Sequence, residues 1–370
     1  MRLLISTGGG DAPGLNAVIY AAVHAAERLG IEIYGVRDSY DGILYPDRYA
    51  GKGVIKLDTE IVRGIAIEGG TFLGTTNRGN PFVHVVKETN GGRTVSNRSA
   101  DVIRAIRDLD ISALISVGGD GSLTIAHQLS QQGLRVIGVP KTIDNDLAAT
   151  DYTFGFQTAV SFATECIERL HATAEAHCRV LCVEVMGRHA GWIALHAGVA
   201  AMADAILIPE IPFTLTNLAA ELRQKKVQHA VVVIAEGAAP MEDPAAGPDR
   251  DAGKRFEGIG QLVASGLEEL LGIETRTVTL GHLLRGGSPV PLDRLLGFGF
   301  GVAAVQAAAD GLGDIMVALD GAKITHVPLA DAIAQLKQVP ADGMAVQVAR
   351  ALGICLGDTS AAAPTARSAA

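Results

Sequence analysis

Short, continuous runs of apolar residues alternate with helix-period segments along most of the chain. Strands are expected at 3–5, 31–36, 113–117, 136–139, 180–185, 205–208, 231–235 and 278–280. Helices are expected between them, among others at 15–29, 101–109, 122–131, 156–174, 218–227 and 259–271. Strands that are apolar on both faces and separated by helices are typical of parallel sheets covered on both sides. The pattern therefore predicts an α/β fold built on parallel sheets.

Length and charge set limits on the class of protein. The 370 residues leave room for about two domains of roughly 100–200 residues each, and 48% of them are hydrophobic, enough for sizeable cores. Lys and Arg number 31 against 40 Asp and Glu, which gives a formal net charge of −9. Because nucleic-acid binding needs a basic surface, we expect no nucleic-acid partner.

Cysteine usage and hydropathy bear on the compartment. The four cysteines (Cys166, Cys178, Cys182 and Cys355) lack zinc-type spacing, so we expect buried thiols in a reducing, cytoplasmic compartment. The N-terminus lacks a signal-peptide pattern. The longest apolar candidate, 295–309, is interrupted by three glycines, and no run reaches the ~18 residues that a membrane span needs. We therefore expect a soluble protein without a membrane partner.

Two segments show no periodicity. Residues 239–254 are rich in Pro, Gly and Asp and are expected to form a loop. Residues 358–370 consist mainly of Ala, Ser and Thr and are expected to form a disordered tail.

A glycine-rich segment, GGGDAPG at 8–14, follows the first expected strand. In open parallel sheets, ligands bind beyond the carboxyl ends of the strands. Glycines let the backbone approach an anion, and the next helix offers free N–H groups at the positive end of its dipole. The segment is neither a Walker A loop nor a dinucleotide fingerprint, since no Lys-Ser/Thr follows and Pro13 takes the third glycine position. A phosphate site and a merely tight turn both stay open on this motif alone.

A second glycine-rich turn, GGDGS at 118–122, also opens a helix. Its Asp120 would repel a phosphate unless a cation lay between them, so Asp120 is a candidate Mg²⁺ ligand. The alternative is that Asp120 is a plain N-cap of a helix that begins at Ser122.

The fourth expected strand is followed by Lys141, Thr142, Asp144 and Asp146. Two carboxylates two residues apart suit a phosphoryl acceptor site, because one acid can take a hydroxyl proton while a cation handles the phosphate charge. An Asp/Asn-rich turn without chemistry is the alternative.

Other strand ends carry a set that matches a phosphorylated polyol. Met186, Gly187 and Arg188 follow one strand and Glu236 follows another, while His282 and Arg285 follow the last. Arginine suits phosphate, and Glu and His suit hydroxyls. Two further arginines, Arg179 and Arg276, open their strands rather than ending them.

Taken together, these segments resemble the 6-phosphofructokinase family. The matching pieces are GGDAPGLN (9–16), GGTFLG (69–74), GGDGS (118–122), TIDND (142–146), DYTFGF (151–156), VEVMGR (183–188), Glu236 and GHLLRGGSPVPLDR (281–294). They stand in the family's order and span residues 1 to about 300.

The resemblance implies a donor site and a reaction. Its donor-binding residues would be Gly9, Arg78, Gly119, Asp120, Gly121, Ser122 and Lys141, with Asp120 also holding Mg²⁺. Asp144 matches the base that takes the proton of the sugar 1-hydroxyl, and Thr142 and Asp146 lie beside the transferring group. The implied reaction is phosphorylation of fructose 6-phosphate to fructose 1,6-bisphosphate in glycolysis, with Mg-ATP as donor.

The resemblance also implies a sugar-phosphate site and an oligomer. Arg188 matches a side chain that steadies the transferring phosphoryl charge, and Met186, Gly187, Glu236, His282 and Arg285 match fructose 6-phosphate contacts. Arg179 and Arg276 match arginines that reach the 6-phosphate of a neighbouring subunit. A homodimer or homotetramer is therefore expected.

From the resemblance we expect two similar Rossmann-like, three-layer domains with an active-site cleft between them. The larger, donor-binding domain would cover 1–155 and 284–334, and the smaller, sugar-phosphate-binding domain would cover 156–283 and 335–357.

Three departures from the family pattern matter. Gly121 and Lys141 form a mixed pair, since ATP-type members usually have Gly at both positions and pyrophosphate-type members Asp and Lys. Gly121 has no side chain to block a nucleotide, so ATP is favoured and pyrophosphate is the alternative. Arg78 stands one residue later than the donor-binding arginine of bacterial ATP enzymes. Where bacterial members have effector-binding arginines, this chain has Tyr20, His24 and His171, which predicts weak control by nucleoside diphosphate or phosphoenolpyruvate.

Three rival functions stay open beside the donor question. The acceptor could be another sugar phosphate such as sedoheptulose 7-phosphate. A non-catalytic, sugar-phosphate-binding member is disfavoured because Asp120, Asp144 and Asp146 are all present. A nicotinamide-dinucleotide kinase would leave the segments at 142–146 and 281–289 unexplained.

Overall fold

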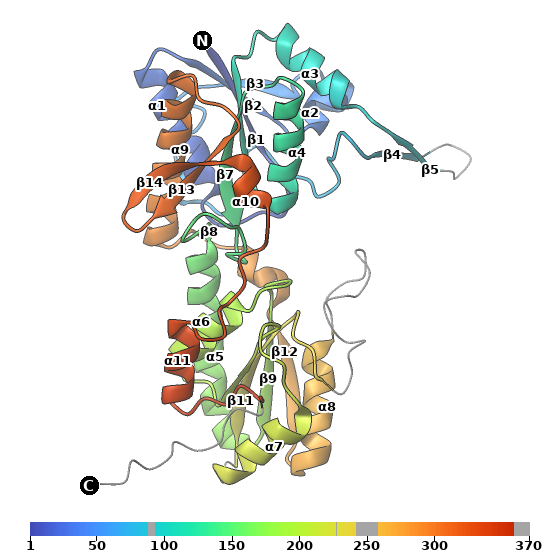
Figure 1. The fold of residues 1–370 in the computed structure, drawn as a ribbon, viewed down its shortest axis with the longest axis vertical. Coiled ribbons are helices and arrows are strands. Elements are labelled where there is room, and N and C mark those ends of the chain that lie inside the picture. The colour runs from blue at the N-terminus through green and yellow to red at the C-terminus, as the bar shows by residue number, and fades with distance from the viewer. Residues whose placement is uncertain (88–92, 227, 242–257, 359–370) are drawn as a thin grey trace. The chain divides into compact units, whose positions relative to one another are not determined.

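The structure is a computed structural model that describes residues 1–87, 93–226, 228–241 and 258–358. It divides into two compact units (Figure 1). Unit 1 consists of Met1–Thr158 and Arg285–Lys337, and unit 2 of Ala159–Leu284 and Gln338–Ala370. Most of the expected loop at 239–254 and, except for Asp358, the expected tail at 358–370 lie outside the described residues.

Unit 1 is built on an eight-stranded sheet with the order β14-β13-β7-β6-β1-β2-β3, and β8 pairs with β7. The five neighbouring strands from β13 to β2 run parallel, whereas β14 and β3 are antiparallel edges. The strands are β1 (Arg2–Thr7), β2 (Glu32–Val36), β3 (Val54–Leu57), β6 (Ala113–Gly118), β7 (Val136–Thr142), β8 (Phe154–Gly155), β13 (Ile315–Asp320) and β14 (Lys323–Pro328).

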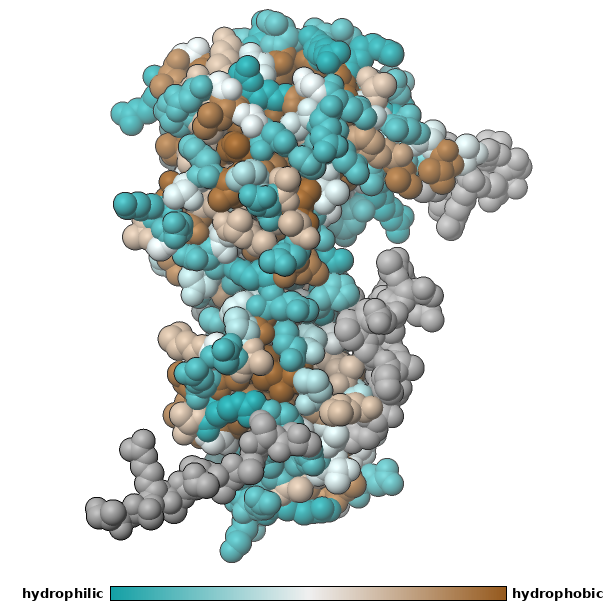
Figure 2. All heavy atoms as spheres, viewed as in Figure 1, coloured by the Kyte–Doolittle hydropathy of each residue, from teal (hydrophilic) through white to brown (hydrophobic). Residues whose placement is uncertain are grey.

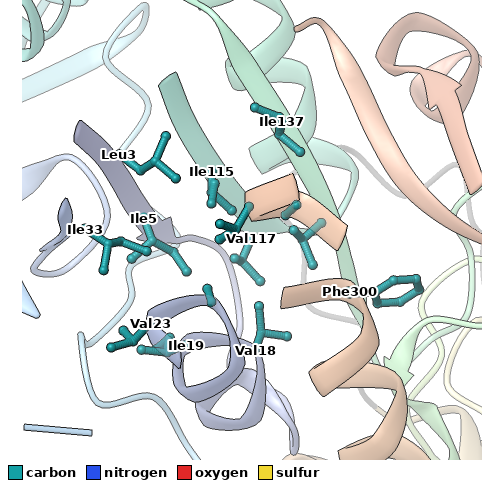
Figure 3. Close-up of a cluster of buried hydrophobic side chains, with 14 of the residues drawn as sticks. Leu3, Ile5, Val18, Ile19, Val23, Ile33, Ile115, Val117, Ile137 and Phe300 are labelled. Carbon is teal, nitrogen blue, oxygen red and sulfur yellow. The ribbon is translucent and has the colours of Figure 1, made fainter. Parts of the chain in front are cut away.

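Alternate residues of these strands feed two separate cores, one on each face of the sheet. On one face Leu3 and Ile5 pack in a cluster with residues of α1 (Leu15–Arg28) and α9 (Pro291–Ala309), as Figure 3 shows. On the other face Leu4 packs with residues of α3 (Ser99–Asp108), α4 (Asp120–Gln131) and α10 (Leu329–Ile333). A strand whose successive side chains are all buried requires this arrangement, because they point to opposite faces.

Helix α9 lies close against α1, and a glycine makes the approach possible. A Cβ added at Gly301 would come within 2.5 Å of the Val18 carbonyl oxygen and 3.0 Å of Ala21 Cβ.

Among the described residues, α9 is the one helix long and apolar enough to cross a membrane, but half of that stretch is buried inside the structure. A core helix meets the same criteria, so the criteria are weak evidence.

Unit 2 is built on a four-stranded parallel sheet with the order β10-β11-β9-β12. Helices α7 and α8 contribute to a buried cluster with β9, β10 and β11, and α6 packs on β10 and β11. Helix α11 packs on α6, and α5 begins in unit 1 and continues in unit 2. The elements are α5 (Phe156–His177), β9 (Val180–Val185), α6 (Trp192–Ala200), β10 (Ala205–Leu207), α7 (Leu215–Gln224), β11 (Ala230–Ala235), α8 (Ile259–Leu271), β12 (Thr275–Thr279) and α11 (Met344–Ala351).

The remaining elements of unit 1 are small. They are α2 (Asp41–Leu44) and the short 3₁₀ helices at Pro46–Tyr49 and Ile65–Ile67, with a hairpin of β4 (His84–Lys87) and β5 (Arg93–Ser96). Figure 2 shows hydrophobic surface next to this hairpin, and the exposed hydrophobic residues there are Val83 and Val95.

The predicted α/β fold with mainly parallel sheets is confirmed. Seven of the expected strands lie where the pattern placed them, and the eighth, expected at 278–280, runs instead from Thr275 to Thr279. The units differ in size, since one sheet has eight strands and the other four. The expectation of buried cysteines is wrong for Cys178, which is exposed, and Cys166, which is half-buried, whereas Cys182 and Cys355 are buried.

Candidate active site

The strand register of unit 1 brings three of the predicted loops to one edge of the sheet. Thr7 of β1 pairs with Val117 of β6, and Gly118 of β6 pairs with Pro140 of β7. The three parallel strands therefore end at the same edge of the sheet, and β7 continues two residues past Pro140, to Thr142. The segments that follow them, at 8–14, 119–122 and 141–146, lie side by side at the carboxyl edge, where α/β proteins bind ligands.

The first turn is fixed by contacts to its neighbours. Gly9 adopts φ +78°, a conformation that favours glycine, and its N–H donates to the Thr76 carbonyl at 3.3 Å. Thr75 Oγ1 donates in return to the Gly9 carbonyl at 2.6 Å. Arg78 is exposed two residues beyond this contact, with its N–H on Thr76 Oγ1 at 3.1 Å. Arg78 therefore follows, two residues along the chain, the segment that contacts Gly9.

The second turn opens helix α4 at Asp120 itself, and the N-cap position is Gly119. The alternative reading of Asp120 as the N-cap of a helix from Ser122 is therefore wrong. The Asp120 residue is half-buried in the first helical turn, where a carboxylate also complements the helix dipole. Ser122 lies against the first turn, since a Cβ added at Gly8 would come within 2.7 Å of its Oγ.

Gly121 faces open space. A Cβ added there would meet no heavy atom within 4 Å, and its φ lies outside the left-handed region. The residue is also exposed. The absence of a side chain at 121 therefore leaves room beside the start of α4 and is not required by the packing.

Lys141 is buried at the end of β7, and its Nζ donates to the Gly10 carbonyl. Burial and, to a lesser extent, the nearby Arg285 lower the pKa of Lys141 to about 8, against the opposing effect of Asp144, Asp11 and Asp146. Arg285 donates to the Asp11 carbonyl at 3.2 Å. Two cations therefore converge on the glycine-rich turn, as an anion site requires.

The third segment is a buried turn that carries two carboxylates. Thr142, Asp144, Asn145 and Asp146 are all less than a tenth exposed. The N–H of Asp144 donates to Thr142 Oγ1 at 3.1 Å, and Asn145 adopts φ +52°. Buried carboxylates need fixed partners or a cation, so this segment is a candidate functional site and not an ordinary surface turn.

Unit 2 repeats the principle at its own carboxyl edge. Val185 of β9 pairs with Ala235 of β11, so Met186, Gly187 and Arg188 begin at the level of Glu236. Glu236 Oε1 accepts the N–H of Gly187 at 3.3 Å and that of Arg188 at 2.9 Å. Met186 is buried, whereas Arg188 is exposed and adopts φ +51°.

His282 follows β12, which pairs with β9 on the other side from β11. It is exposed in a short 3₁₀ helix, Gly281–Arg285, and this helix crosses the division between the units, so that Arg285 belongs to unit 1. The structure therefore gathers the expected sugar-phosphate residues into two groups, with Arg285 beside the glycine-rich turn and the others in unit 2.

The structure does not bring Arg179 and Arg276 to that edge. Arg179 precedes β9 and Arg276 is the second residue of β12, so both lie at the amino edge of the sheet. Both arginines hydrogen-bond Glu274, with Arg179 Nε at 2.7 Å from Glu274 Oε2. The Arg179 hydrogen bond, with Arg276, lowers the pKa of Glu274.

Sequence analysis missed three residues that hold these turns. Lys337 and Thr153 contact the turn at 142–146, and Glu210 accepts the N–H groups of Gly191 and Val339 in unit 2. Burial raises the pKa of Glu210. Thr153 stands within the DYTFGF segment at 151–156, whereas Lys337 and Glu210 stand in none of the matching segments, and Lys337 lies far along the chain from its partners. Only the tertiary fold identifies these two.

These features define a class of protein. Backbone N–H groups at helix starts, a buried lysine and paired buried carboxylates at one sheet edge suit an enzyme that handles phosphate groups, with a second polar edge for another substrate.

Comparison with known proteins gives the family. Residues 2–308 match the family model described as Phosphofructokinase, and the chain belongs to this family. It is 47% identical over 361 residues to a protein of Chloroflexus aggregans named ATP-dependent 6-phosphofructokinase, an alignment that covers 96% of this chain and 98% of the relative. It is also 47% identical over 348 residues to a protein of Amycolatopsis methanolica named pyrophosphate–fructose 6-phosphate 1-phosphotransferase, with 92% and 96% covered.

A solved structure gives the same result. The crystal structure of Pichia pastoris phosphofructokinase in the T-state superposes with a TM-score of 0.76 at 31% identity over 90% of this chain. This chain spans about a third of that longer one (35%).

Proposed function

We propose that the protein phosphorylates fructose 6-phosphate at its 1-hydroxyl, with Mg-ATP as donor, to give fructose 1,6-bisphosphate and ADP. The observation that carries the proposal is that β1, β6 and β7 end at the same edge of their sheet, where they are followed by the two glycine-rich turns and by the segment that holds Asp144 and Asp146. A phosphate chain and an acceptor hydroxyl need such neighbouring sites for in-line transfer.

The donor site would lie along the two glycine-rich turns. Gly9 has no side chain to keep a phosphate away from the backbone, Gly119 stands at the start of α4, Ser122 offers a hydroxyl, and Lys141 adds a buried positive charge. Arg78 is exposed beside the Gly9 turn and would contact the donor. The open space at Gly121 favours a nucleotide over pyrophosphate, because a bulkier residue would occupy it.

Magnesium fits Asp120. Among the described residues no group of three or more His, Cys, Asp or Glu could hold a metal by itself. Mg²⁺ is commonly bound through one or two carboxylates and the phosphates of a substrate, which a single half-buried carboxylate at a phosphate turn provides. When bound, the ion neutralises charge on the phosphates.

Asp144 would act as the base. Its carboxylate accepts the proton of the 1-hydroxyl while that oxygen forms a bond to the γ-phosphorus and the bond to the ADP oxygen breaks. Thr142 and Asp146 lie within two residues and would orient the acceptor. Arg188 would steady charge on the transferring group.

The sugar phosphate would be bound by Met186, Gly187, Glu236, His282 and Arg285. We assign Arg179 and Arg276 to the 6-phosphate of a neighbouring subunit in a cytoplasmic homodimer or homotetramer, because the family resemblance implies this role and both lie at the opposite edge of the unit 2 sheet from Met186 and Glu236. Glu274 holds both arginines until a phosphate competes for them.

Control by nucleoside diphosphate or phosphoenolpyruvate is expected to be weak. Tyr20 and His24 lie ring to ring, with centroids 4.3 Å apart, and His171 Nε2 lies 2.8 Å from the Ala201 carbonyl. These side chains replace guanidinium groups that would bind a diphosphate. An effect of either compound on fructose 6-phosphate saturation at physiological concentration would contradict this.

The deciding experiment is a set of parallel assays with purified protein and Mg²⁺. ATP and pyrophosphate are each supplied with fructose 6-phosphate and, separately, with sedoheptulose 7-phosphate. We expect ATP with fructose 6-phosphate to give the highest kcat/KM. Faster transfer from pyrophosphate, or to the seven-carbon sugar, would replace the donor or the acceptor, and no transfer from either donor would overturn the proposal.

A further inference from the structure

Lys337, the last residue of unit 1, is tied to the turn that carries Asp144 and Asp146. Its Nζ donates to Asn145 Oδ1 at 3.1 Å and to the carbonyls of Thr150 and Asp151, each at 2.9 Å. Its backbone N–H donates to the Asp146 carbonyl at 2.8 Å. One residue therefore holds the turn through both its side chain and its backbone.

The geometry at Nζ calls for an ammonium group. Three acceptors surround it, and a lysine ammonium has three N–H donors, whereas a neutral amine has two. The charged groups that act on it, Asp146 and Asp151, both favour the ammonium, while burial lowers its pKa to about 8. A half-buried cation with three fixed partners constrains those partners more tightly than a fully solvated one would.

The amide that Lys337 contacts is the centre of the turn. Asn145 Oδ1 also accepts the N–H of Thr153 at 3.2 Å, and Thr153 Oγ1 donates to the Thr142 carbonyl at 2.7 Å. Asn145 stands between the two carboxylates and adopts the left-handed φ of +52°. Its side chain therefore fixes the backbone from which Asp144 and Asp146 project.

The next residues of the chain are fixed as well, within unit 2. Val339 donates its N–H to Glu210 Oε1 at 2.9 Å. The segment is therefore anchored in unit 1 at Lys337 and, two residues later, in unit 2 at Val339.

We propose that Lys337 is a positioning residue for phosphoryl transfer, which holds Asn145 and the backbone of Asp146 so that Asp144 stays in place to accept the hydroxyl proton. This inference rests on the proposed function. Lys337 acts through Asn145 and is not itself assigned a contact with the substrates.

The test is a double-mutant cycle of Lys337→Met and Asn145→Gly on kcat. Glycine tolerates the φ of residue 145, so Asn145→Gly deletes the amide and keeps the backbone conformation. Each single variant is expected to lower kcat about 10- to 100-fold, with the KM for ATP within about twofold, because misplacement of a catalytic group slows the chemical step. The double variant is expected to be no slower than the slower single variant.

The control is Lys323→Met, which removes an exposed lysine of unit 1 in β14. It is expected to keep wild-type kcat. Thermal unfolding of each variant shows whether it folds, and if Lys337→Met does not, Asn145→Gly alone decides.

The outcomes separate this inference from the proposed function. A wild-type protein without transfer from either donor overturns both. If the wild type is active and the folded variants keep its kcat, the positioning role alone is overturned. The same holds if kcat is kept and only the KM for ATP rises. Multiplied losses in the double variant do the same, because they mean that Lys337 does not act through Asn145.

Discussion

The carboxyl edges of the two sheets hold their functional residues differently. In unit 1, Lys141, Thr142, Asp144 and Asp146 are buried and held by contacts from distant parts of the chain. In unit 2, Arg188 and His282 are exposed, and Glu236 binds the backbone of its neighbours. Buried charges keep their positions during a reaction, and exposed ones suit a substrate that enters and leaves. From this comparison we propose that unit 1 carries out the chemical step and that unit 2 contributes most of the sugar-phosphate binding.

The largest expected effect is on the buried carboxylate of unit 1. Asp144→Ala is expected to lower kcat about 10²–10⁴-fold, the usual contribution of a general base. Steady-state assays with fructose 6-phosphate and Mg-ATP measure it, with Asp331→Ala, an exposed acid of α10, as control. Near-normal turnover of Asp144→Ala would remove the proposed base and the contrast between the two edges.

The relative use of ATP and pyrophosphate tests the role of the open space beside Gly121 in unit 1. Gly121→Asp is expected to lower kcat/KM for ATP at least about tenfold, because like charges brought together cost several kcal/mol. Use of pyrophosphate should fall less. Gly121→Ala is the matched control, since a Cβ meets nothing there. Equal losses with both donors would contradict the proposal that residue 121 decides between them.

Substitutions at the carboxyl edge of the unit 2 sheet are expected to change the KM for the sugar phosphate more than kcat. Glu236→Ala removes the acceptor of two backbone N–H groups and is expected to raise the KM for fructose 6-phosphate about tenfold, with a smaller change in kcat. Glu236→Gln keeps an acceptor oxygen and should bind better than the alanine variant. A loss confined to kcat would instead place Glu236 with the chemical step.

The smallest expected effect concerns stability and pH. Since the folded pKa of Lys141 is about 8 and its ordinary value 10.5, the unfolded chain binds more protons between these values. The free energy of unfolding should therefore rise with pH in this window, by at most ~1.4 kcal/mol per pH unit for one group. Lys337 is shifted in the same sense.

Urea unfolding at about pH 7.5 to about 9.5, a range that overlaps that window, measures how the free energy of unfolding changes with pH. Lys141→Met should make the slope shallower, whereas Lys323→Met should leave it unchanged. An unchanged slope in Lys141→Met would mean that Lys141 keeps an ordinary pKa in the folded protein.

Local pattern was enough for the parallel strands but not for the sheet edges. Strands β6 and β9 are buried along their whole length and are mostly apolar because both of their faces are covered, so they stand out in the sequence. The antiparallel edges β3 and β14 are partly exposed, and their mixed residues give no clear period. Their pairing with β2 and β13 depends on neighbours that the chain brings together only on folding.

The amino-acid sequence by itself determined the α/β class, the phosphate-type turns and the residues that these turns carry, because each is encoded within a few neighbouring positions. The tertiary structure alone decided that Arg179 contacts Glu274 at the other edge of their sheet and that Lys337 holds Asn145. These contacts join residues that lie far apart along the chain, so no period or motif indicates them. They form because close packing fixes which side chains meet.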